Sequence, residues 1–236
     1  MKVLLTAPLR QDPKIFVEYQ KALDALIIPE SVTVDRYFVV NDCPEVIPYI
    51  NGSYDVINTE DEYIKTKDDH IWTDENLDKM SKLRNCTIEK AKSYDYWFSV
   101  DTDLILQPET LKVLLEADKD IVSEVFWSKA PNGEWWCNAW MYDIYDPDGQ
   151  LPKWREPGLY KVGMTGACTL AKTKVFNENV NYSKIPNLKI WGEDRWFCIR
   201  AAVEGYEMWL DTHYPALHLY TEDIYNEYVK NVHIFN

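Results

Sequence analysis

The chain lacks the cysteine spacing and the long apolar runs that mark several classes of protein. Its 236 residues include five cysteines, and no two of them form a Cys-x-x-Cys pair. An odd, scattered set predicts neither a zinc cluster nor a disulfide scaffold, and it favours a reducing compartment. The apolar stretch Val3–Leu9 is too short for a signal peptide, and no later stretch approaches the length of a membrane span. We therefore expect a cytoplasmic protein with no transmembrane segment.

Positive charge is also scarce. Lys and Arg number 25 against 39 Asp and Glu, which gives a formal net charge of −14. This balance argues against nucleic acid or an anionic membrane as the main partner. An anionic small ligand would need local cations or a metal ion to hold it. No repeat or low-complexity linker is present, and the length suits one large α/β domain.

In the first half of the chain, apolar runs alternate with stretches of helical periodicity. Such alternation predicts a mostly parallel sheet. The acidic stretch Thr59–Trp72 is typical of a loop. We expect strands at Lys2–Thr6, Val32–Val40, Asp55–Asn58, Tyr96–Val100 and Ile121–Phe126, and helices from Pro13, over Asp74–Ser93 and over Pro108–Ala117.

The second half of the chain has a different residue pattern, which predicts Trp-rich loops from Trp127 to about Tyr160. After it we expect a strand at Val162–Ala171, a helix at Glu193–Glu204, short strands at Glu207–Leu210 and Ala216–Leu219, and a polar tail. The prediction is a single α/β domain with a mostly parallel central sheet and a smaller antiparallel C-terminal part. Residues 1–126 would form a nucleotide-binding half, 127–220 a substrate-facing half and 221–236 the tail, without independent folding.

A pair of aspartates, Asp101 and Asp103, directly follows the most apolar and aromatic strand. Ligands of open α/β sheets bind at the carboxyl ends of strands, and paired carboxylates suit a hard divalent cation. The alternative is a simple turn, because Asp is common in turns. Asp146-Pro147-Asp148-Gly149 has the same spacing and is a plain β-turn signal. The position of Asp101 and Asp103 after a buried strand favours a metal site.

A second group of polar residues lies near the C-terminus. Glu193 and Asp194 open a helix, and His218 lies between two leucines about two dozen residues later. Together with Asp101-Thr102-Asp103, this ordered set resembles the GT-A-type glycosyltransferases, whose fold is Rossmann-like. The resemblance extends from about Lys2 to Tyr220, and the ordered set is more specific than any one motif.

The resemblance implies a role for each matching residue. Asp103 would bind the metal, Asp101 the metal or the donor ribose, and His218 would be the third protein ligand. An imidazole ligand favours Mn²⁺ over Mg²⁺. A packed histidine between two leucines is the alternative for His218. His70 is expected to be a solvated loop residue rather than a ligand, and His213 and His233 have no evident partner.

The catalytic base would be Asp194, or less favourably Glu193, acting on an acceptor hydroxyl in an inverting displacement. Acidic residues are also favoured in the first turn of any helix, where the helix dipole stabilises the charged form. That effect would lower the carboxylate pKa and make the base weaker. A retaining mechanism stays open.

Donor contacts are expected from both halves. Leu9, Arg10 and Asp42 follow the first two strands, where this fold class binds the nucleoside, and Thr102 lies between the paired aspartates. Lys82 and Arg84 would bind the diphosphate, or else form an exposed basic helix face. Gly166 in the small-residue segment Gly163–Cys168 would lie beside the donor sugar, with a bulge or tight packing as the alternative.

The tryptophans of the second half are candidates for an acceptor platform. Aromatic rings pack well on the apolar faces of sugars, although most Trp residues in such a domain are partly core. We expect one or two of the five to contact the acceptor: Trp127, Trp135, Trp136, Trp140 and Trp154.

The resulting prediction is a glycosyltransferase that uses Mn²⁺ or Mg²⁺ and takes a sugar from a UDP- or GDP-sugar to a glycan or other hydroxyl acceptor. One alternative is a non-catalytic carbohydrate-binding module, which would need no nucleotide-binding half. The other is a sugar-nucleotide nucleotidyltransferase. Against it, the loop Ala7–Pro13 after the first strand has no glycine.

Overall fold

The computed structural model describes residues 1–58, 73–129, 133–141, 152–188 and 192–232. The predicted loop Thr59–Trp72 and the predicted turn at Asp146–Gly149 lie outside these ranges. His70 and His233 lie outside them as well.

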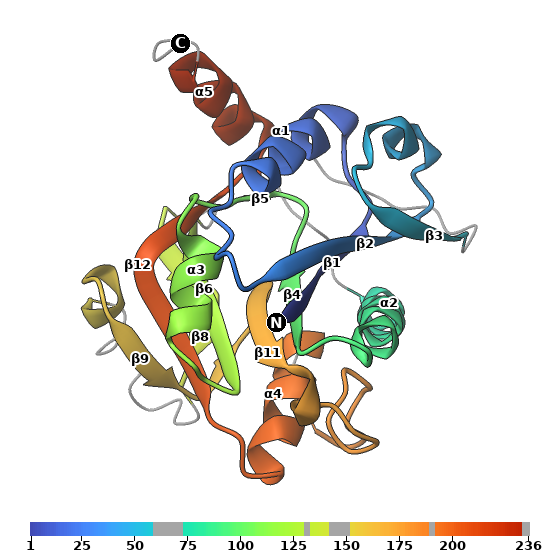
Figure 1. The fold of residues 1–236 in the computed structure, drawn as a ribbon, viewed down its shortest axis with the longest axis vertical. Coiled ribbons are helices and arrows are strands. Elements are labelled where there is room, and N and C mark those ends of the chain that lie inside the picture. The colour runs from blue at the N-terminus through green and yellow to red at the C-terminus, as the bar shows by residue number, and fades with distance from the viewer. Residues whose placement is uncertain (59–72, 130–132, 142–151, 189–191, 233–236) are drawn as a thin grey trace.

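A twisted sheet runs through the molecule and carries strands from both ends of the chain (Figure 1). Along it the strands follow the order β3-β2-β1-β4-β11-β6-β12-β5, with β7 paired to β6 and β9 paired to β12. The bounds are β1 Lys2–Leu9, β2 Thr33–Asn41, β3 Ser53–Ile57, β4 Tyr96–Val100, β5 Leu104–Ile105, β6 Ile121–Lys129, β7 Trp135–Cys137, β9 Leu159–Val162, β11 Cys168–Lys172 and β12 Met208–His218.

The central run of this sheet is mostly parallel, as predicted. The strands β3, β2, β1 and β4 pair in parallel, and so do β6 and β12. Between these two blocks lies β11, which is antiparallel to both of its neighbours. A separate small antiparallel sheet joins β8 (Ala139–Trp140) to β10 (Met164–Thr165). The predicted α/β class is therefore confirmed.

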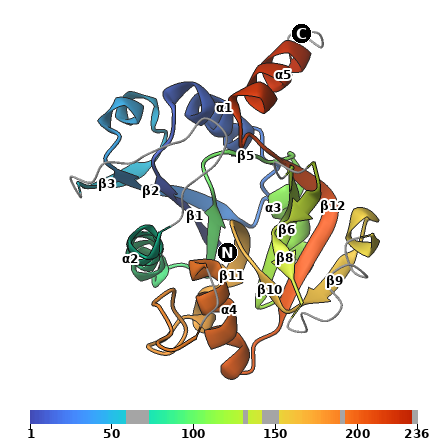
Figure 2. The same cartoon turned by 180° about the vertical axis from the view of Figure 1, so that it is seen from behind.

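Helices cover both faces of the sheet. Helices α1 (Pro13–Asp24) and α3 (Thr110–Glu116) pack on one face, and α2 (Asp74–Ala91) and α4 (Glu193–Val203) pack on the other (Figures 1 and 2). Short 3-10 helices lie at Pro44–Tyr49, Lys153–Arg155 and Thr173–Val175.

Local capping explains where two of these helices begin. The Asp12 side chain accepts a hydrogen bond from the backbone N–H of Lys14 at 3.0 Å, and Pro13 occupies the first turn of α1. At α2, the Thr73 hydroxyl accepts from the backbone N–H of Asn76 at 3.2 Å. Each cap satisfies a backbone donor that has no partner within its helix.

Two apolar clusters, one on each face, hold the layers together. On the α1 side, Phe16 meets Phe38 of β2 edge to face at 5.7 Å. On the α4 side, Phe197 stacks on Tyr182 at 4.8 Å. Burial of these rings stabilises the packing of α1 on β2, and of α4 on the loop that carries Tyr182.

The predicted strand Val162–Ala171 is wrong, because the chain turns twice within it. Its residues belong to three strands, β9, β10 and β11, in two different sheets. Ala167 adopts a left-handed conformation with φ of 65°, and the backbone N–H of Cys168 donates to the carbonyl of Gly166 at 2.8 Å. This tight turn separates β10 from β11.

Two further predictions near the C-terminus need correction. The predicted short strands Glu207–Leu210 and Ala216–Leu219 are one strand, β12, whose pairing with β6 shifts register between Asp211 and Ala216. The predicted polar tail contains an amphipathic helix, α5 (Glu222–Val232), which projects from the body of the molecule (Figure 1).

All five cysteines are free thiols, and only Cys86 is exposed. Within the described ranges, no helix combines the length and the apolar character needed to cross a membrane.

Candidate active site

A cavity of about 410 Å³ opens at the carboxyl ends of β1, β2 and β4. This is the edge of an α/β sheet at which ligands bind. Residues from both halves of the chain line it, and they include most of the predicted site residues. These are Leu9, Arg10, Asp101, Thr102, Asp103, Gly166, Asp194 and His218.

Backbone hydrogen bonds fix the loop that carries Asp101 and Asp103. The N–H of Asp101 donates to the carbonyl of Ala167 at 2.9 Å, which ties the end of β4 to the turn before β11. The N–H of Leu219 donates to the carbonyl of Asp103 at 2.8 Å, and His218 pairs with Leu104 across β12 and β5. The C-terminal strand is thereby held against the aspartate loop, so residues over a hundred positions apart become neighbours.

The imidazole of His218 and the carboxylate of Asp103 face each other. Nε2 of His218 lies 3.4 Å from Oδ2 of Asp103, and the two side chains are 12% and 17% exposed. Ligands of an octahedral ion at about 2.1 Å from the metal lie about 3 Å apart. A carboxylate oxygen and an imidazole nitrogen at this separation fit a divalent transition-metal ion such as Mn²⁺.

The third predicted ligand, Asp101, is arranged differently. Arg84 approaches its carboxylate, with Nη2 3.0 Å from Oδ1 and 3.2 Å from Oδ2. Over the part of the chain that the structure describes, no three His, Cys, Asp or Glu side chains form a ready group for a metal ion. The preformed part of the site is the pair Asp103 and His218, and a metal bond from Asp101 stays a prediction.

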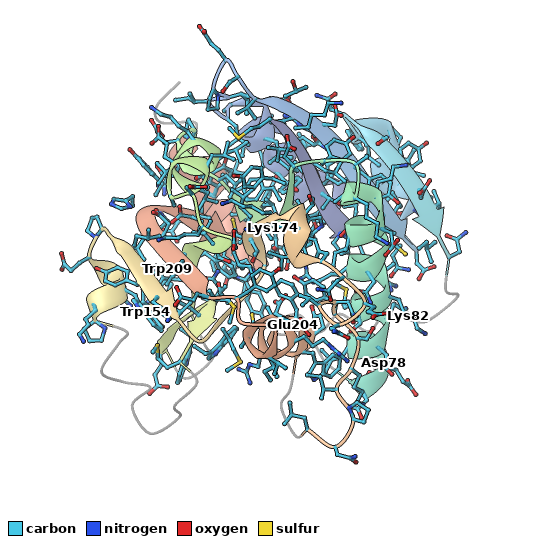
Figure 3. All side chains as sticks on the ribbon, turned by 60° about the horizontal axis from the view of Figure 1, so that its bottom comes forward. Asp78, Lys82, Trp154, Lys174, Glu204 and Trp209 are labelled. Carbon is cyan, nitrogen blue, oxygen red and sulfur yellow. The ribbon has the colours of Figure 1, made fainter. Side chains whose placement is uncertain are left out.

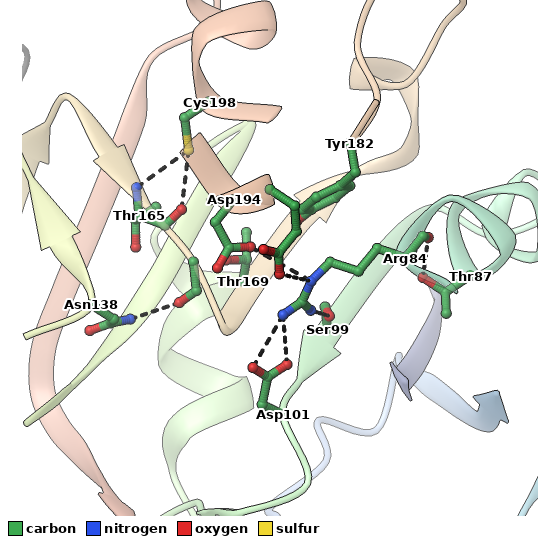
Figure 4. Close-up of polar contacts among 12 residues, drawn as sticks. Arg84, Thr87, Ser99, Asp101, Asn138, Thr165, Thr169, Tyr182, Asp194 and Cys198 are labelled. Carbon is green, nitrogen blue, oxygen red and sulfur yellow. Dashed lines mark hydrogen bonds and ion pairs between the residues drawn. The ribbon is translucent and has the colours of Figure 1, made fainter. Parts of the chain in front are cut away.

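Arg84 is the centre of an ion-pair network that joins α2, β4 and α4 (Figure 4). Its guanidinium also donates to Ser99 Oγ and to Glu193 Oε1, both at 3.2 Å, and lies 3.8 Å from Asp194 Oδ1. Only 2% of the Arg84 side chain is exposed. The alternative of an exposed basic face is therefore wrong for Arg84. Its guanidinium binds carboxylates and the Ser99 hydroxyl, and Arg84 is not among the residues that line the cavity.

Asp194 reaches the cavity, whereas Glu193 lies outside its lining. Burial raises the pKa of the Asp194 carboxyl to about 8, against the opposing attraction of Arg84. Burial also raises the pKa of Asp101, to about 6. The expectation that the helix dipole leaves Asp194 with a lowered pKa is therefore wrong, because loss of solvent outweighs it.

Gly166 has a steric reason to be glycine. A Cβ at this position would lie 2.1 Å from Oδ2 and 2.3 Å from Cγ of Asp194. The carboxylate thus packs directly against the Gly166 backbone. Asn138 holds that backbone in place. Its side-chain nitrogen donates to the Gly166 carbonyl at 2.9 Å (Figure 4), and its backbone carbonyl accepts from the Gly166 N–H at 3.2 Å.

At the other end of the cavity, the residues after β1 and β2 form a charged group. Asp42 lies outside the lining but is 3.8 Å from Nη1 of Arg10 and 4.0 Å from Nζ of Lys79. Lys82 is exposed on the outward side of α2, away from the cavity (Figure 3). The lysine of α2 that lines the cavity is Lys79, one turn earlier.

The five tryptophans have separate environments. Trp136 and Trp140 line the cavity, and Arg195 lies over the Trp140 ring at 4.6 Å. Trp154 is core, at 3% exposure, and Arg155 covers Trp127 at 4.0 Å. Trp135 is half exposed outside the cavity.

Several residues that build the site were not predicted. Lys79 lies on the same face of α2 as Asn76, Met80 and Leu83, which also line the cavity. Their helical spacing is the sequence pattern from which Lys79 could have been predicted. No sequence pattern indicated Ser128 or Asn138, because only the folded sheet brings these two residues to the cavity. His213 has a partner after all, since its Nδ1 lies 3.0 Å from the buried carboxylate of Asp211.

Solved structures of glycosyltransferases share this fold. S. aureus TarS in complex with UDP-GlcNAc aligns with a TM-score of 0.56 at 17% identity, over 95% of this chain and 61% of that one. GalNAc-T7 with UDP, GalNAc and Mn²⁺ aligns with a TM-score of 0.58 at 12% identity, over 94% of this chain and 43% of that one. At such identities the likeness concerns the fold, which is the predicted GT-A type.

Sequence comparison narrows this result. An 83-residue stretch, 34% of the chain, is 32% identical to human procollagen-lysine,2-oxoglutarate 5-dioxygenase 2, and it spans only 10% of that relative. Residues 30–201 match the N-terminal domain of glycosyltransferase family 25. That match covers most of the described core and all of the predicted site except Leu9, Arg10 and His218. The chain belongs to glycosyltransferase family 25.

Proposed function

We propose that this enzyme uses Mn²⁺ or Mg²⁺ to move a sugar from a UDP- or GDP-sugar to the hydroxyl of a glycan or other acceptor. The observation that carries the proposal is the cavity itself. It brings the Asp103–His218 pair and the partly buried carboxyl of Asp194 to one space at the carboxyl ends of the strands. The nucleotides bound by TarS and GalNAc-T7, and the Mn²⁺ of GalNAc-T7, support a similar donor here.

The metal ion would be held by Asp103 and His218, with Asp101 either joining them or binding the donor ribose. When bound, such an ion neutralises charge that develops on the leaving diphosphate. The imidazole favours Mn²⁺ over Mg²⁺. Arg84 would keep Asp101 in place from behind, because it is buried and shares hydrogen bonds with Asp101 and Glu193.

The donor would lie between the two charged ends of the cavity. Leu9 and Arg10 would contact the nucleoside with help from Asp42, and Thr102 and Gly166 would lie beside the ribose and the sugar. Lys79, instead of Lys82 and Arg84, would bind the donor diphosphate, because Lys79 is the lysine of α2 that lines the cavity. An ammonium group at this position suits a diphosphate in a strongly acidic protein.

The acceptor hydroxyl would meet Asp194 as general base in an inverting displacement. A pKa of about 8 suits a base that works near neutral pH. Oδ1 of Asp194 is buried 3.8 Å from Nε of Arg84, so the acceptor hydroxyl would meet the carboxylate at its other oxygen, Oδ2. Glu193, bound to Arg84 and outside the lining, is the weaker candidate.

Of the five candidate tryptophans, Trp136 and Trp140 would form the acceptor platform, because they line the cavity. Each offers an aromatic face to the apolar side of a sugar ring. A carbohydrate-binding module or a nucleotidyltransferase would fit the family membership of the chain less well than a glycosyltransferase does.

A hydrolysis screen of nucleotide sugars with Mn²⁺ present tests this function. We expect slow release of UDP or GDP from one sugar nucleotide, and no release after chelation of the metal. The anomeric configuration of the product, read by NMR, separates inversion from retention. Metal-independent hydrolysis, or no turnover of any UDP- or GDP-sugar, would contradict the proposal.

A further inference from the structure

Ser128 lies beside the ring edge of His218 that faces away from Asp103. Its Oγ is 2.8 Å from Nδ1 of the imidazole, while Nε2 on the other side is 3.4 Å from Asp103. Ser128 belongs to β6 and His218 to the neighbouring strand β12, and both line the cavity. This hydroxyl therefore bonds directly to the nitrogen that would not bind a metal ion.

Other contacts fix the position of the ring without choosing whether Nε2 or Cε1 faces Asp103. Phe126 packs edge to face on the imidazole at 4.9 Å, and Tyr220 lies at 5.1 Å. The terminal torsion of a histidine is broad and roughly two-fold, so apolar packing alone leaves two ring orientations with similar contacts. A hydrogen bond to one nitrogen distinguishes them.

We propose that Ser128 is a positioning residue, which orients His218 so that Nε2 meets the metal ion. The inference rests on the proposed metal-dependent function. In the loaded enzyme, Nδ1–H donates to Ser128 Oγ, and the lone pair of Nε2 is left for the ion. Such outer hydrogen bonds fix the tautomer and the orientation of a metal-binding histidine.

The test compares Ser128→Ala with Ser123→Ala. Ser123 is a matched control on the same strand, fully buried, with a 2.7 Å hydrogen bond to Thr169 on the neighbouring strand β11. Electron paramagnetic resonance of Mn²⁺, with UDP present, gives the metal affinity. We expect Ser128→Ala to weaken Mn²⁺ binding by about 10-fold to 100-fold, and Ser123→Ala to leave it unchanged.

Two further measurements separate orientation of the ring from general loss of structure. Ser128→Thr keeps the hydroxyl and should restore most of the Mn²⁺ affinity. Competition with Mg²⁺ should show a smaller loss for Mg²⁺ than for Mn²⁺ in Ser128→Ala, because imidazole ligation favours Mn²⁺. The thermal unfolding temperature monitors folding of each variant.

The outcomes distinguish this inference from the proposed function. If the wild-type protein binds UDP but no Mn²⁺, the metal-dependent function fails and the inference falls with it. If the wild-type protein binds Mn²⁺ and Ser128→Ala binds it equally well, only the inference is overturned. Equal losses in Ser123→Ala and Ser128→Ala would also overturn it.

Discussion

The carboxylate of Asp194 illustrates how position in the fold changes the chemistry of a single residue. Its place in the first turn of α4 predicts a lowered pKa. In the folded protein, however, the side chain lies between Gly166 and the buried Arg84, and only 20% of it is exposed. Burial raises its pKa to about 8, so the same residue becomes a better base than its helix position implies.

Replacement of Asp194 by Asn tests its role as base. Asn keeps the shape of the side chain but cannot accept a proton, so we expect kcat to fall by about 10²-fold to 10⁴-fold. Calorimetry with the nucleotide should give nearly unchanged donor affinity, since the loss is confined to the transition state.

Glu193→Gln is the matched control for this change, because Glu193 is the neighbouring carboxylate and binds Arg84 at 3.2 Å. It should lower stability more than it lowers kcat. A kcat loss in Glu193→Gln as large as that in Asp194→Asn would contradict the assignment of the base. Equal damage to donor binding in Asp194→Asn would mean that Asp194 has a structural role.

Gly166→Ala tests the close contact between the Asp194 carboxylate and the backbone. The added methyl group would lie 2.1 Å from Oδ2, so Asp194 must move. We expect kcat to fall with donor affinity partly kept, and stability to fall by about 1–3 kcal/mol from overpacking. Enzyme kinetics and thermal unfolding measure the two effects.

Gly205→Ala is the control, because Gly205 has φ of 87° and open space around its Cβ position. It should destabilise the protein through backbone strain while the rate is kept. Full activity in Gly166→Ala would show that Asp194 tolerates displacement.

The residues of the site differ in whether the neighbouring sequence is enough to predict them. Asp101, Asp103 and Asp194 could be predicted because each follows a strand or opens a helix, and those boundaries are visible in the sequence. Lys79 was missed in favour of Lys82, because the choice between adjacent turns depends on how α2 is rotated on the sheet. The role of Ser128 depends on its contact with His218, which is ninety residues away in the sequence, so the neighbouring sequence could not predict it.

At the scale of elements, the strands of the first half were predictable and those of the second half were not. Buried parallel strands such as β4 are continuous apolar runs with turn signals at their ends. The segment from β9 to β11 is equally apolar, but small residues allow turns within it. In β12 the reverse holds. Residues 211–215 include polar side chains and a proline, which suggest a break, but the strand only changes register with β6 there.

That register shift lies beside a buried acidic pair. Glu124 of β6 is fully buried and pairs in register with Asp211 of β12, which is 2% exposed. Burial, and then the negative charge of Asp211, raise the pKa of Glu124 to about 9. Glu124 is therefore protonated in the folded protein at neutral pH.

The raised pKa of Glu124 predicts how stability changes with pH. As pH rises from about 5 to about 9, the unfolded chain has already lost this proton while the folded protein keeps it. The free energy of unfolding then falls by up to about 1.4 kcal/mol per pH unit from this group. Glu124→Gln should remove that fall, as chemical denaturation across the pH range would show.

Glu116→Gln is the control for this measurement, because Glu116 is an exposed residue of α3. It should keep the wild-type pH dependence. A slope in Glu124→Gln as steep as that of the wild type would mean that Glu124 is already ionised at neutral pH in the folded protein.

At the scale of the whole molecule, the sheet interleaves the two sequence halves. Strand β11 lies between β4 and β6, and β12 lies beside β6 (Figure 2). The cavity accordingly takes Asp103 from one half and Asp194, Gly166 and His218 from the other. The division into a donor half and an acceptor half stays a prediction about ligand contacts.

The central claim is that Asp103 and His218 hold a metal ion that binds the donor diphosphate. Calorimetric titration of UDP, with and without Mn²⁺, into the wild-type protein and Asp103→Ala tests it most directly. We predict that Mn²⁺ raises UDP affinity at least about tenfold in the wild type, equal to about 1.4 kcal/mol, and has no such effect in Asp103→Ala. Equal UDP affinity with and without Mn²⁺ in the wild-type protein would contradict the claim.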